Sequence, residues 1–264
     1  MMKKFSREYA TAAEAAIQAG KIVLEAQGKA AVKEKSLNNL VTEADLAAQE
    51  VIIKTIKQNF PDHLIIAEEG DLRAGSDGDN LWIIDPLDGT NNYAHNIPQF
   101  SISIAYARSG QVLTGVVYDP VRNEMFSAEH TGGAFLNNRP IKTSAAASLQ
   151  EAIIATGFYY DRGDIMRKTL SSIEKLFEAN IHGIRRFGSA ALDLCWLACG
   201  RFDAYFEYKI SIWDFAAGML IVNEAGGKCS DQYGKPLSLK AGGLIVSNGN
   251  FHNDFLALVS LTKP

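Results

Sequence analysis

The spacing of apolar and polar positions predicts two helices near the start of the chain. An amphipathic helix is expected over 6–27, and a second helix over 42–60 that ends before Pro61. Thr42 and Asp45 have nearly the spacing of a capping box, which satisfies free backbone amides at a helix start. The two helices therefore have both a pattern and end signals.

Short apolar runs predict strands in the middle of the chain. Residues 81–84 (L-W-I-I) form a continuous apolar run, which is typical of a buried strand. Other runs with strand character are 64–67, 101–107, 112–118 and 124–128. Turn-forming residues separate the last three, so we expect an antiparallel meander there. Polar stretches are expected to be a connector over 28–40 and a loop over 70–80.

From about residue 145 the pattern changes to strands that alternate with helices. The predicted strands are 152–156, 183–187, 202–208 and 244–247. The predicted helices are 164–178, 189–199, 213–225 and 250–261. Such alternation indicates an α/β half. We therefore expect a layered α/β fold of two halves, an α+β half over 1–146 and an α/β half over 147–264.

Composition and charge exclude several classes of protein. The chain has 264 residues, of which 47% are apolar and 21% charged, so it can bury a core without a disulfide or metal staple. The net charge of −4 argues against a dedicated nucleic-acid binder, although not against phosphorylated substrates. No apolar run approaches the ~20 residues that span a bilayer. Glu14, Gln18 and Lys21 interrupt any signal-peptide core, so we expect a cytoplasmic protein.

Other sources of chemistry have little support. Cys195, Cys199 and Cys229 lack close C-x-x-C spacing, and we expect the first two to pack as small apolar residues on a helix face. Motifs of dinucleotide binding, of P-loops and of serine hydrolases are absent. The S-x-x-K pattern at 172–175 lacks its companion motifs, so a serine nucleophile is not expected.

Carboxylates placed at the ends of elements are the informative feature. Asp85 and Asp88 flank Pro86 and Leu87 where an apolar strand ends, and a turn with two carboxylates and a free carbonyl suits Mg²⁺. A solvated turn is the alternative for this short motif alone. The other candidates also have ordinary explanations, as surface charge or as acids that stabilise a helix start: Glu68, Glu69, Asp45 and Asp214.

A set of longer motifs collects these acids. They are L-V-T-E-A-D (40–45), A-E-E-G (67–70), W-I-I-D-P-L-D-G-T-N-N-Y (82–93), G-V-V-Y-D-P (115–120), G-I-R-R-F-G-S-A-A-L-D-L (183–194), W-D-F-A-A-G (213–218) and E-A-G-G (224–227). With these motifs in this order, the chain resembles the inositol monophosphatase family of Mg²⁺-dependent, lithium-sensitive phosphatases. The resemblance implies a five-layer α-β-α-β-α sandwich, shared with fructose-1,6-bisphosphatase, and a homodimer.

The resemblance also implies the metal ligands and the reacting water. Glu69, Asp85 and the Leu87 carbonyl would hold one Mg²⁺, and Asp85, Asp88 and Asp214 a second. Glu69 would also border a third, weaker site. Thr90, oriented by Asp45, would position the attacking water together with Glu69 and deprotonate it. The hydrolysis would proceed in line, without a covalent intermediate.

The substrate residues follow from the same resemblance. Those implied to contact the phosphate or the alcohol are Asp88, Gly89, Thr90, Gly188, Ser189, Ala190 and Glu207. Two departures concern residues near the third metal: Asn39 stands where animal members have an aspartate, and the alignment of Lys35 is displaced by one position. Arg185 and Arg186 would steer a second phosphate or form ion pairs in a dimer. Tyr159 and Tyr160 would line the entrance or simply pack.

Inositol monophosphate is the substrate we expect, with hydrolysis to inositol and phosphate. Fructose-1,6-bisphosphate, histidinol phosphate, NADP and 3′-phosphoadenosine nucleotides are the alternatives, although the chain lacks the insertions of the nucleotide-directed members. A different alternative is a regulatory protein of transcription or ribosome assembly with residual phosphatase activity. Neither nucleic acid nor a membrane is expected as a partner.

Overall fold

The structure is a computed structural model, and it describes residues 5–29, 32–36, 39–69, 79–160, 162–240 and 242–262. The helices within these ranges are α1 (Arg7–Ala26), α2 (Glu43–Asn59), α3 (Thr90–Ala94), α4 (Asp164–Glu178), α5 (Ala190–Ala198), α6 (Ile212–Glu224) and α7 (His252–Val259). None of them is long and apolar enough to cross a membrane. The described strands form three sheets, with two, seven and five strands.

The seven-stranded sheet is mostly antiparallel. Its order is β3-β4-β5-β6-β7-β8-β9, and β3 and β4 are its one parallel pair among the described strands. The strands are β3 (Leu64–Ala67), β4 (Asn80–Asp88), β5 (Ser101–Arg108), β6 (Gln111–Asp119), β7 (Glu124–Glu129), β8 (Ala134–Leu136) and β9 (Arg139–Pro140). The antiparallel pairing of β5, β6 and β7 confirms the predicted meander.

The five-stranded sheet is mixed. Its order is β11-β10-β12-β14-β13, with β10 parallel to both β11 and β12, and β14 antiparallel to both of its neighbours. The strands are β10 (Ile153–Thr156), β11 (Gly183–Arg185), β12 (Ala204–Ile210), β13 (Lys228–Asp231) and β14 (Gly242–Ser247). This sheet lies beyond residue 152 and the larger one before residue 141, while the predicted division into 1–146 and 147–264 stays a prediction.

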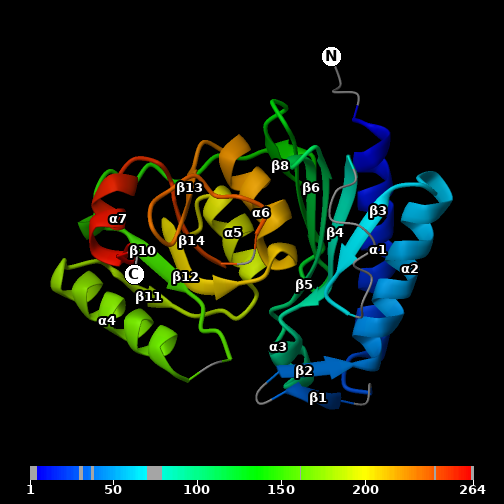
Figure 1. Cartoon of the computed structure of the whole chain (residues 1–264), viewed down its shortest axis with the longest axis horizontal. Coiled ribbons are helices and arrows are strands. Elements are labelled where there is room, and N and C mark those ends of the chain that lie inside the picture. The colour runs from blue at the N-terminus through cyan, green and yellow to red at the C-terminus, as the bar shows by residue number, and fades with distance from the viewer. Residues whose placement is uncertain are drawn as a thin grey trace.

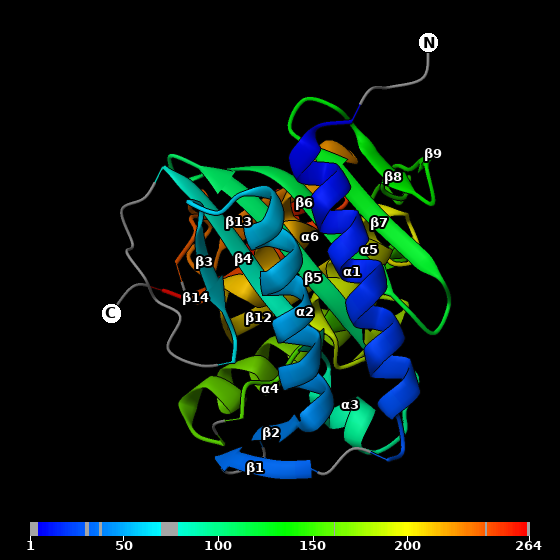
Figure 2. The same cartoon turned by 90° about the vertical axis from the view of Figure 1, so that its right-hand side faces the viewer.

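Five layers follow one another across the molecule. In Figure 1, α4 and α7 cover one face of the five-stranded sheet, α5 and α6 fill the space between the sheets, and α1 and α2 cover the far face of the seven-stranded sheet. Figure 2 shows α1 and α2 side by side on that outer face. The buried apolar residues form three clusters: one surrounds the inner helices between the two sheets, and one lies between each sheet and its outer helices. The layered α-β-α-β-α fold is therefore confirmed.

The inner helices pack closely because of two glycines. A Cβ at Gly115 of β6 would lie 2.7 Å from the backbone oxygen of Ala217 in α6. A Cβ at Gly218 of α6 would lie 2.7 Å from two carbon atoms of Leu194 in α5. The absent side chains let α6 lie against β6 and against α5.

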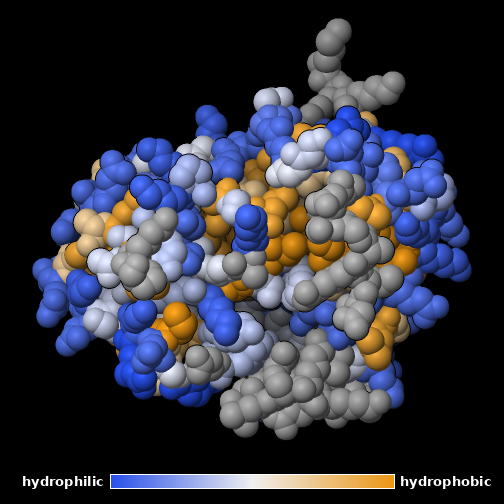
Figure 3. Space-filling model, in the orientation of Figure 1, coloured by the Kyte–Doolittle hydropathy of each residue, from blue (hydrophilic) through white to orange (hydrophobic). Residues whose placement is uncertain are grey.

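Figure 3 shows hydrophilic side chains over the outer helices and a hydrophobic band in the middle of the same face.

Several short elements were not predicted. Residues 32–36 and 39–42 form an antiparallel pair, β1 (Val32–Ser36) and β2 (Asn39–Thr42), where we expected a polar connector. The side chains of Lys35 and Asn39 lie outside what the structure describes. Strands β8, β9 and β13 and helix α3 are also new, because none has a long apolar pattern of its own. The predicted loop over 70–80 lies mostly outside the described residues.

Strand β4 is longer than predicted, and the extension carries the predicted metal ligands. We expected the strand to end at Ile84, but it continues to Asp88. Asp85 pairs with Ser103 and Asp88 with Ser101, so the register shifts between the two aspartates. Pro86 has no N–H to donate to the ladder, which explains an irregularity at this point. Gly89 follows with φ of 97°, a left-handed conformation that favours glycine.

Candidate metal centre and active site

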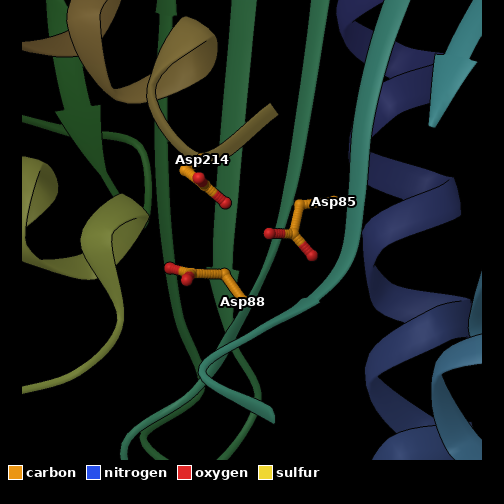
Figure 4. Close-up of side chains that lie close together, drawn as sticks. All are labelled: Asp85, Asp88 and Asp214. Atoms are coloured by element: carbon orange, nitrogen blue, oxygen red, sulfur yellow. The ribbon is translucent and has the colours of Figure 1, made fainter. Parts of the chain in front are cut away.

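Three carboxylates from two distant parts of the chain converge on one point. Asp85 and Asp88 come from the end of β4, and Asp214 comes from the first turn of α6. One oxygen of each lies within 4.8 Å of the others, and Figure 4 shows the three side chains pointing toward one another. Asp85 and Asp88 are buried and Asp214 is partly buried.

Hydrogen bonds hold each carboxylate in place. Asp85 Oδ1 accepts from the backbone amide of Leu87 at 3.0 Å. Asp214 Oδ2 accepts from the amide of Ser211 at 2.9 Å, as part of the capping box that begins α6. Asp88 is bound from the other half of the fold, as α5 starts beside it and the Ala191 amide donates to its Oδ2 at 2.8 Å.

Burial makes this cluster unfavourable in its ionised form. It raises the pKa of Asp88 to about 6, and it raises the pKa of Asp85 and Asp214 well above the usual range. The neighbouring carboxylates add to the shift of the last two. A hard divalent cation would relieve both the repulsion and the lost solvation, and it prefers oxygen ligands. The described residues therefore fit a metal ion of the Mg²⁺ kind.

The cluster forms part of the wall of a cavity of about 200 Å³. Most of the predicted site residues line it: Asp85, Leu87, Asp88, Gly89, Thr90, Gly188, Ser189, Ala190, Glu207 and Asp214. They come from β4, from the start of α3, from the start of α5, from β12 and from α6. The cavity lies where the ends of both sheets meet the inner helices, so residues more than 100 positions apart share one wall.

The predicted pair of Thr90 and Asp45 is brought together. Thr90 Oγ1 lies 3.1 Å from Asp45 Oδ1 and 3.0 Å from the Leu87 carbonyl oxygen. Asp45 is fully buried, and its second oxygen accepts from the amide and hydroxyl of Thr42 at 2.8 and 2.5 Å. The Asp45 side chain therefore both caps the start of α2 and binds the Thr90 hydroxyl.

The two adjacent glutamates differ in a way the sequence did not indicate. Glu68 lines the cavity, and its charge raises the pKa of Asp85 and Asp214. Glu69, the predicted ligand, is buried, is absent from the described lining, and has its backbone bound on both sides by the Gln49 side chain. Both glutamates follow the end of β3 at Ala67, and Glu68 is the one of the two that lines the cavity with the carboxylate cluster.

The cavity wall also carries a second group of polar residues. Glu207 Oε2 accepts a hydrogen bond of 2.5 Å from the Tyr205 hydroxyl, and burial raises the Glu207 pKa to about 7. A Cβ at Gly157 would overlap the Glu207 carboxylate, so the glycine makes room for it. Tyr205 lies two positions before Glu207 in β12 and Lys209 lies two positions after it, and both line the cavity.

Other predicted residues divide between the cavity and the surface. Tyr159, Tyr160 and Arg186 line the cavity, whereas Arg185 is exposed and its guanidinium binds the Ile184 carbonyl at 3.0 Å. Sequence reasoning missed several lining residues, Asp193, Tyr205 and Lys209, and it gave the metal role to Glu69 rather than to the candidate Glu68. Strand alternation around Glu207 and the spacing of four from Ser189 to Asp193 on a helix would have found the three missed residues.

Comparison with known proteins identifies the family to which this site belongs. The model of the inositol monophosphatase family matches residues 5–262. The chain belongs to the inositol monophosphatase family. A relative from Synechocystis, named inositol-1-monophosphatase, is 43% identical over 95% of this chain and 88% of its own length. A relative from Pasteurella multocida, named Nus factor SuhB, is 43% identical over 81% of this chain and 79% of its own length.

A solved structure supports the same assignment. The extragenic suppressor protein suhB from Bartonella henselae has a TM-score of 0.92 and 34% identity, and the match covers 98% of this chain and 100% of that one. The family predicted from the motifs is therefore confirmed. For an inositol monophosphatase family member, the acidic cavity described above is the site with the chemistry of a metal-dependent phosphatase.

Proposed function

We propose that this chain is a Mg²⁺-dependent phosphomonoesterase that hydrolyses inositol monophosphate to inositol and phosphate. The observation that carries the proposal is the convergence of Asp85, Asp88 and Asp214, within 4.8 Å, on the wall of a cavity. A homodimer, a cytoplasmic location and sensitivity to lithium accompany this function in the family resemblance and stay predictions.

The ligands for two to three Mg²⁺ ions are the three aspartates, the Leu87 carbonyl and Glu68, which takes the place predicted for Glu69. All five line the same cavity. Bound Mg²⁺ supplies an acidified water and neutralises charge on the oxygen of the leaving alcohol. The pKa values raised by burial support this set, because a cation offsets the cost of keeping the carboxylates ionised.

The Thr90 hydroxyl orients the attacking water. Its single proton goes to the buried Asp45 carboxylate or to the Leu87 carbonyl, and a lone pair of its oxygen then faces the cavity. A water held there donates one proton to Thr90 and presents its own lone pair to phosphorus. Glu68, on the same wall, accepts the other proton. Asp45 is a positioning residue in this scheme.

The phosphate and the alcohol are held by separate parts of the wall. The Gly89 and Thr90 amides bind the phosphate oxygens, as the family resemblance implies. The alcohol faces Gly188, Ser189, Ala190 and Glu207, which line the same cavity. Glu207 can accept from hydroxyl groups through the oxygen that does not bind Tyr205.

The direct test is phosphate release from a substrate panel at varied Mg²⁺, with and without Li⁺. The panel holds inositol 1-phosphate, fructose-1,6-bisphosphate, histidinol phosphate, NADP and a 3′-phosphoadenosine nucleotide. We expect the highest kcat/KM for inositol 1-phosphate, dependence on Mg²⁺, and near-complete loss in D88N with the fold intact by circular dichroism. A higher kcat/KM for another substrate would show that the enzyme hydrolyses the phosphate ester of a different alcohol. Near-normal activity of D88N would show that Asp88 is not a metal ligand.

A regulatory role through protein contacts is the second candidate. The name Nus factor SuhB of the Pasteurella multocida relative favours it, and the intact acidic cluster favours catalysis beside it. Affinity capture with wild type and D88N separates the two functions. Partners retained equally by both variants would support a role that does not need the metal centre. If the folded wild type hydrolyses none of the substrates, the regulatory role is the remaining candidate function.

A further inference from the structure

Asp193 is a buried carboxyl group for which the fold supplies no complete set of partners. It lies in the first turn of α5, is 1% exposed, and lines the cavity. Its Oδ1 has no hydrogen-bond partner within the described part of the chain. Buried polar atoms nearly always have partners, so an exception in the wall of a cavity calls for an explanation.

Helix capping does not explain Asp193. An acid in the first turn of a helix usually stabilises the free amides there. At α5 the Ala191 amide already has another acceptor, Asp88 Oδ2 at 2.8 Å, which also accepts from the Ser189 hydroxyl at 2.6 Å. Asp88, which lies in β4, thus caps the start of α5, and Asp193 does not have that role.

The surroundings of Asp193 disfavour its charge in the free protein. Burial raises its pKa well above the usual range, and the carboxylates of Asp88 and Glu207 raise it further, while Arg186 lowers it. A side chain that is kept in such a place contributes more to a complex than to the free fold. The group that would complete it is a hydrogen-bond donor in the cavity.

We propose that Asp193 is a specificity-determining residue whose Oδ1 accepts a hydrogen bond from a hydroxyl group of the alcohol part of the substrate. Glu207 lines the same cavity, with one oxygen committed to Tyr205. The carboxyl groups of Asp193 and Glu207 accept hydrogen bonds from two hydroxyl groups of one polyol. This inference rests on the proposed phosphatase function, and it selects phosphates of polyhydroxylated alcohols over those of simple alcohols or phenols.

The test compares two substrates in the full-length enzyme with Mg²⁺. Inositol 1-phosphate has neighbouring hydroxyl groups, and p-nitrophenyl phosphate has none on its leaving group. In D193L we expect the ratio of their kcat/KM values to fall about tenfold, mostly through KM for inositol 1-phosphate, which is the size of one hydrogen bond. D193N keeps an acceptor oxygen and should retain most of the ratio.

Thermal unfolding of the free proteins separates recognition from structure. D193L and D193N should melt at a higher temperature than wild type, since each replaces a buried carboxyl group whose hydrogen bonds are incomplete. The control is Asp203, which is also buried but accepts from Ser144 Oγ at 2.5 Å and from the Ile153 amide at 2.7 Å. D203N should melt at a lower temperature and leave the substrate ratio unchanged.

Two results would overturn the inference while leaving the proposed function standing. One is an unchanged substrate ratio in D193L. The other is an equal loss on both substrates with a lower melting temperature, which is the behaviour expected of a structural residue. If the wild type hydrolyses neither substrate, the proposed function has failed and the role of Asp193 falls with it.

Discussion

The Ser189 hydroxyl donates a hydrogen bond of 2.6 Å to the Asp88 carboxylate, across 101 positions of sequence. Asp88 belongs to the strand that carries two of the clustered acids, and Ser189 begins the helix beside the alcohol end of the cavity. This contact lowers the pKa of Asp88 against the larger, raising effect of burial. The contact therefore links the ionisation of Asp88, a proposed metal ligand, to Ser189, a proposed substrate residue.

Removal of this hydroxyl should weaken the metal site. In S189A the Asp88 carboxylate keeps the Ala191 amide but loses one donor, so its ionised form becomes less favourable. We expect the Mg²⁺ concentration for half-maximal activity to rise about fivefold, the size of one modest hydrogen bond. S189T keeps a hydroxyl and serves as the control. Equal Mg²⁺ dependence in wild type and S189A would show that the contact has no role in metal binding.

The two glutamates after β3 offer a matched pair of substitutions. E68Q removes a charge from the cavity wall, whereas E69Q changes a residue outside the described lining. We expect E68Q to lower kcat about 100-fold and to raise the Mg²⁺ requirement, as loss of a proton acceptor commonly does. E69Q should stay within about tenfold of wild type. The reverse ranking would return the role to Glu69, as predicted from the sequence.

Gly157 should control the position of Glu207. An added methyl group would overlap the Glu207 carboxylate and displace it from the Tyr205 hydroxyl. We expect G157A to raise KM for inositol 1-phosphate about tenfold with little change in the Mg²⁺ requirement. In an E207Q background the added cost should be small, because the two changes act on one contact. G242A is the control, since its Cβ would meet only the Gln232 side chain at 3.4 Å.

His252 should make stability depend on pH. Burial, together with the Lys228 charge, lowers its pKa from 6.5 to about 4. Its ring nitrogens lie 2.8 Å from Ser230 Oγ and 2.9 Å from Ser247 Oγ. The lowered pKa means that the neutral ring contributes stability above pH 6.5, and that this contribution is lost as the pH falls toward 4.

The variant H252Q isolates this effect. Its side chain does not titrate, so the free energy of unfolding of wild type should fall by roughly 2 kcal/mol more than that of H252Q between pH 7 and pH 4. Urea denaturation at both pH values measures the difference. Parallel pH dependence of the two proteins would show that His252 can be protonated in the folded state at little cost.

The long elements were predictable because their burial leaves a periodic pattern. The buried run at 81–84 and the amphipathic pattern of 6–27 lie within β4 and within or beside α1. The short strands β1, β2 and β13 were missed because each has only four or five residues and none has a long apolar run. The continuation of β4 to Asp88 was missed because Pro86 indicates a turn.

The candidate site was predictable to the level of the motif, and less so to the single residue. Asp85, Asp88 and Asp214 carry the motifs, and the structure brings them together. Glu68 lines the cavity and Glu69 is not among the lining residues, and an adjacent pair of identical residues gives no signal for that difference. Asp193 looks like an ordinary helix-start acid until the Ala191 amide is seen to bind Asp88 instead.

If the converging carboxylates hold Mg²⁺ for phosphate ester hydrolysis, the loss of Asp214 should abolish that reaction. Asp214 comes from α6, yet it meets Asp85 and Asp88. The measurement is phosphate release from inositol 1-phosphate by wild type and D214N across a range of Mg²⁺ concentrations. We predict saturable Mg²⁺-dependent release by wild type, and a kcat at least about 1,000-fold lower in a folded D214N. Release that is independent of Mg²⁺, or a D214N that matches wild type, would contradict the account.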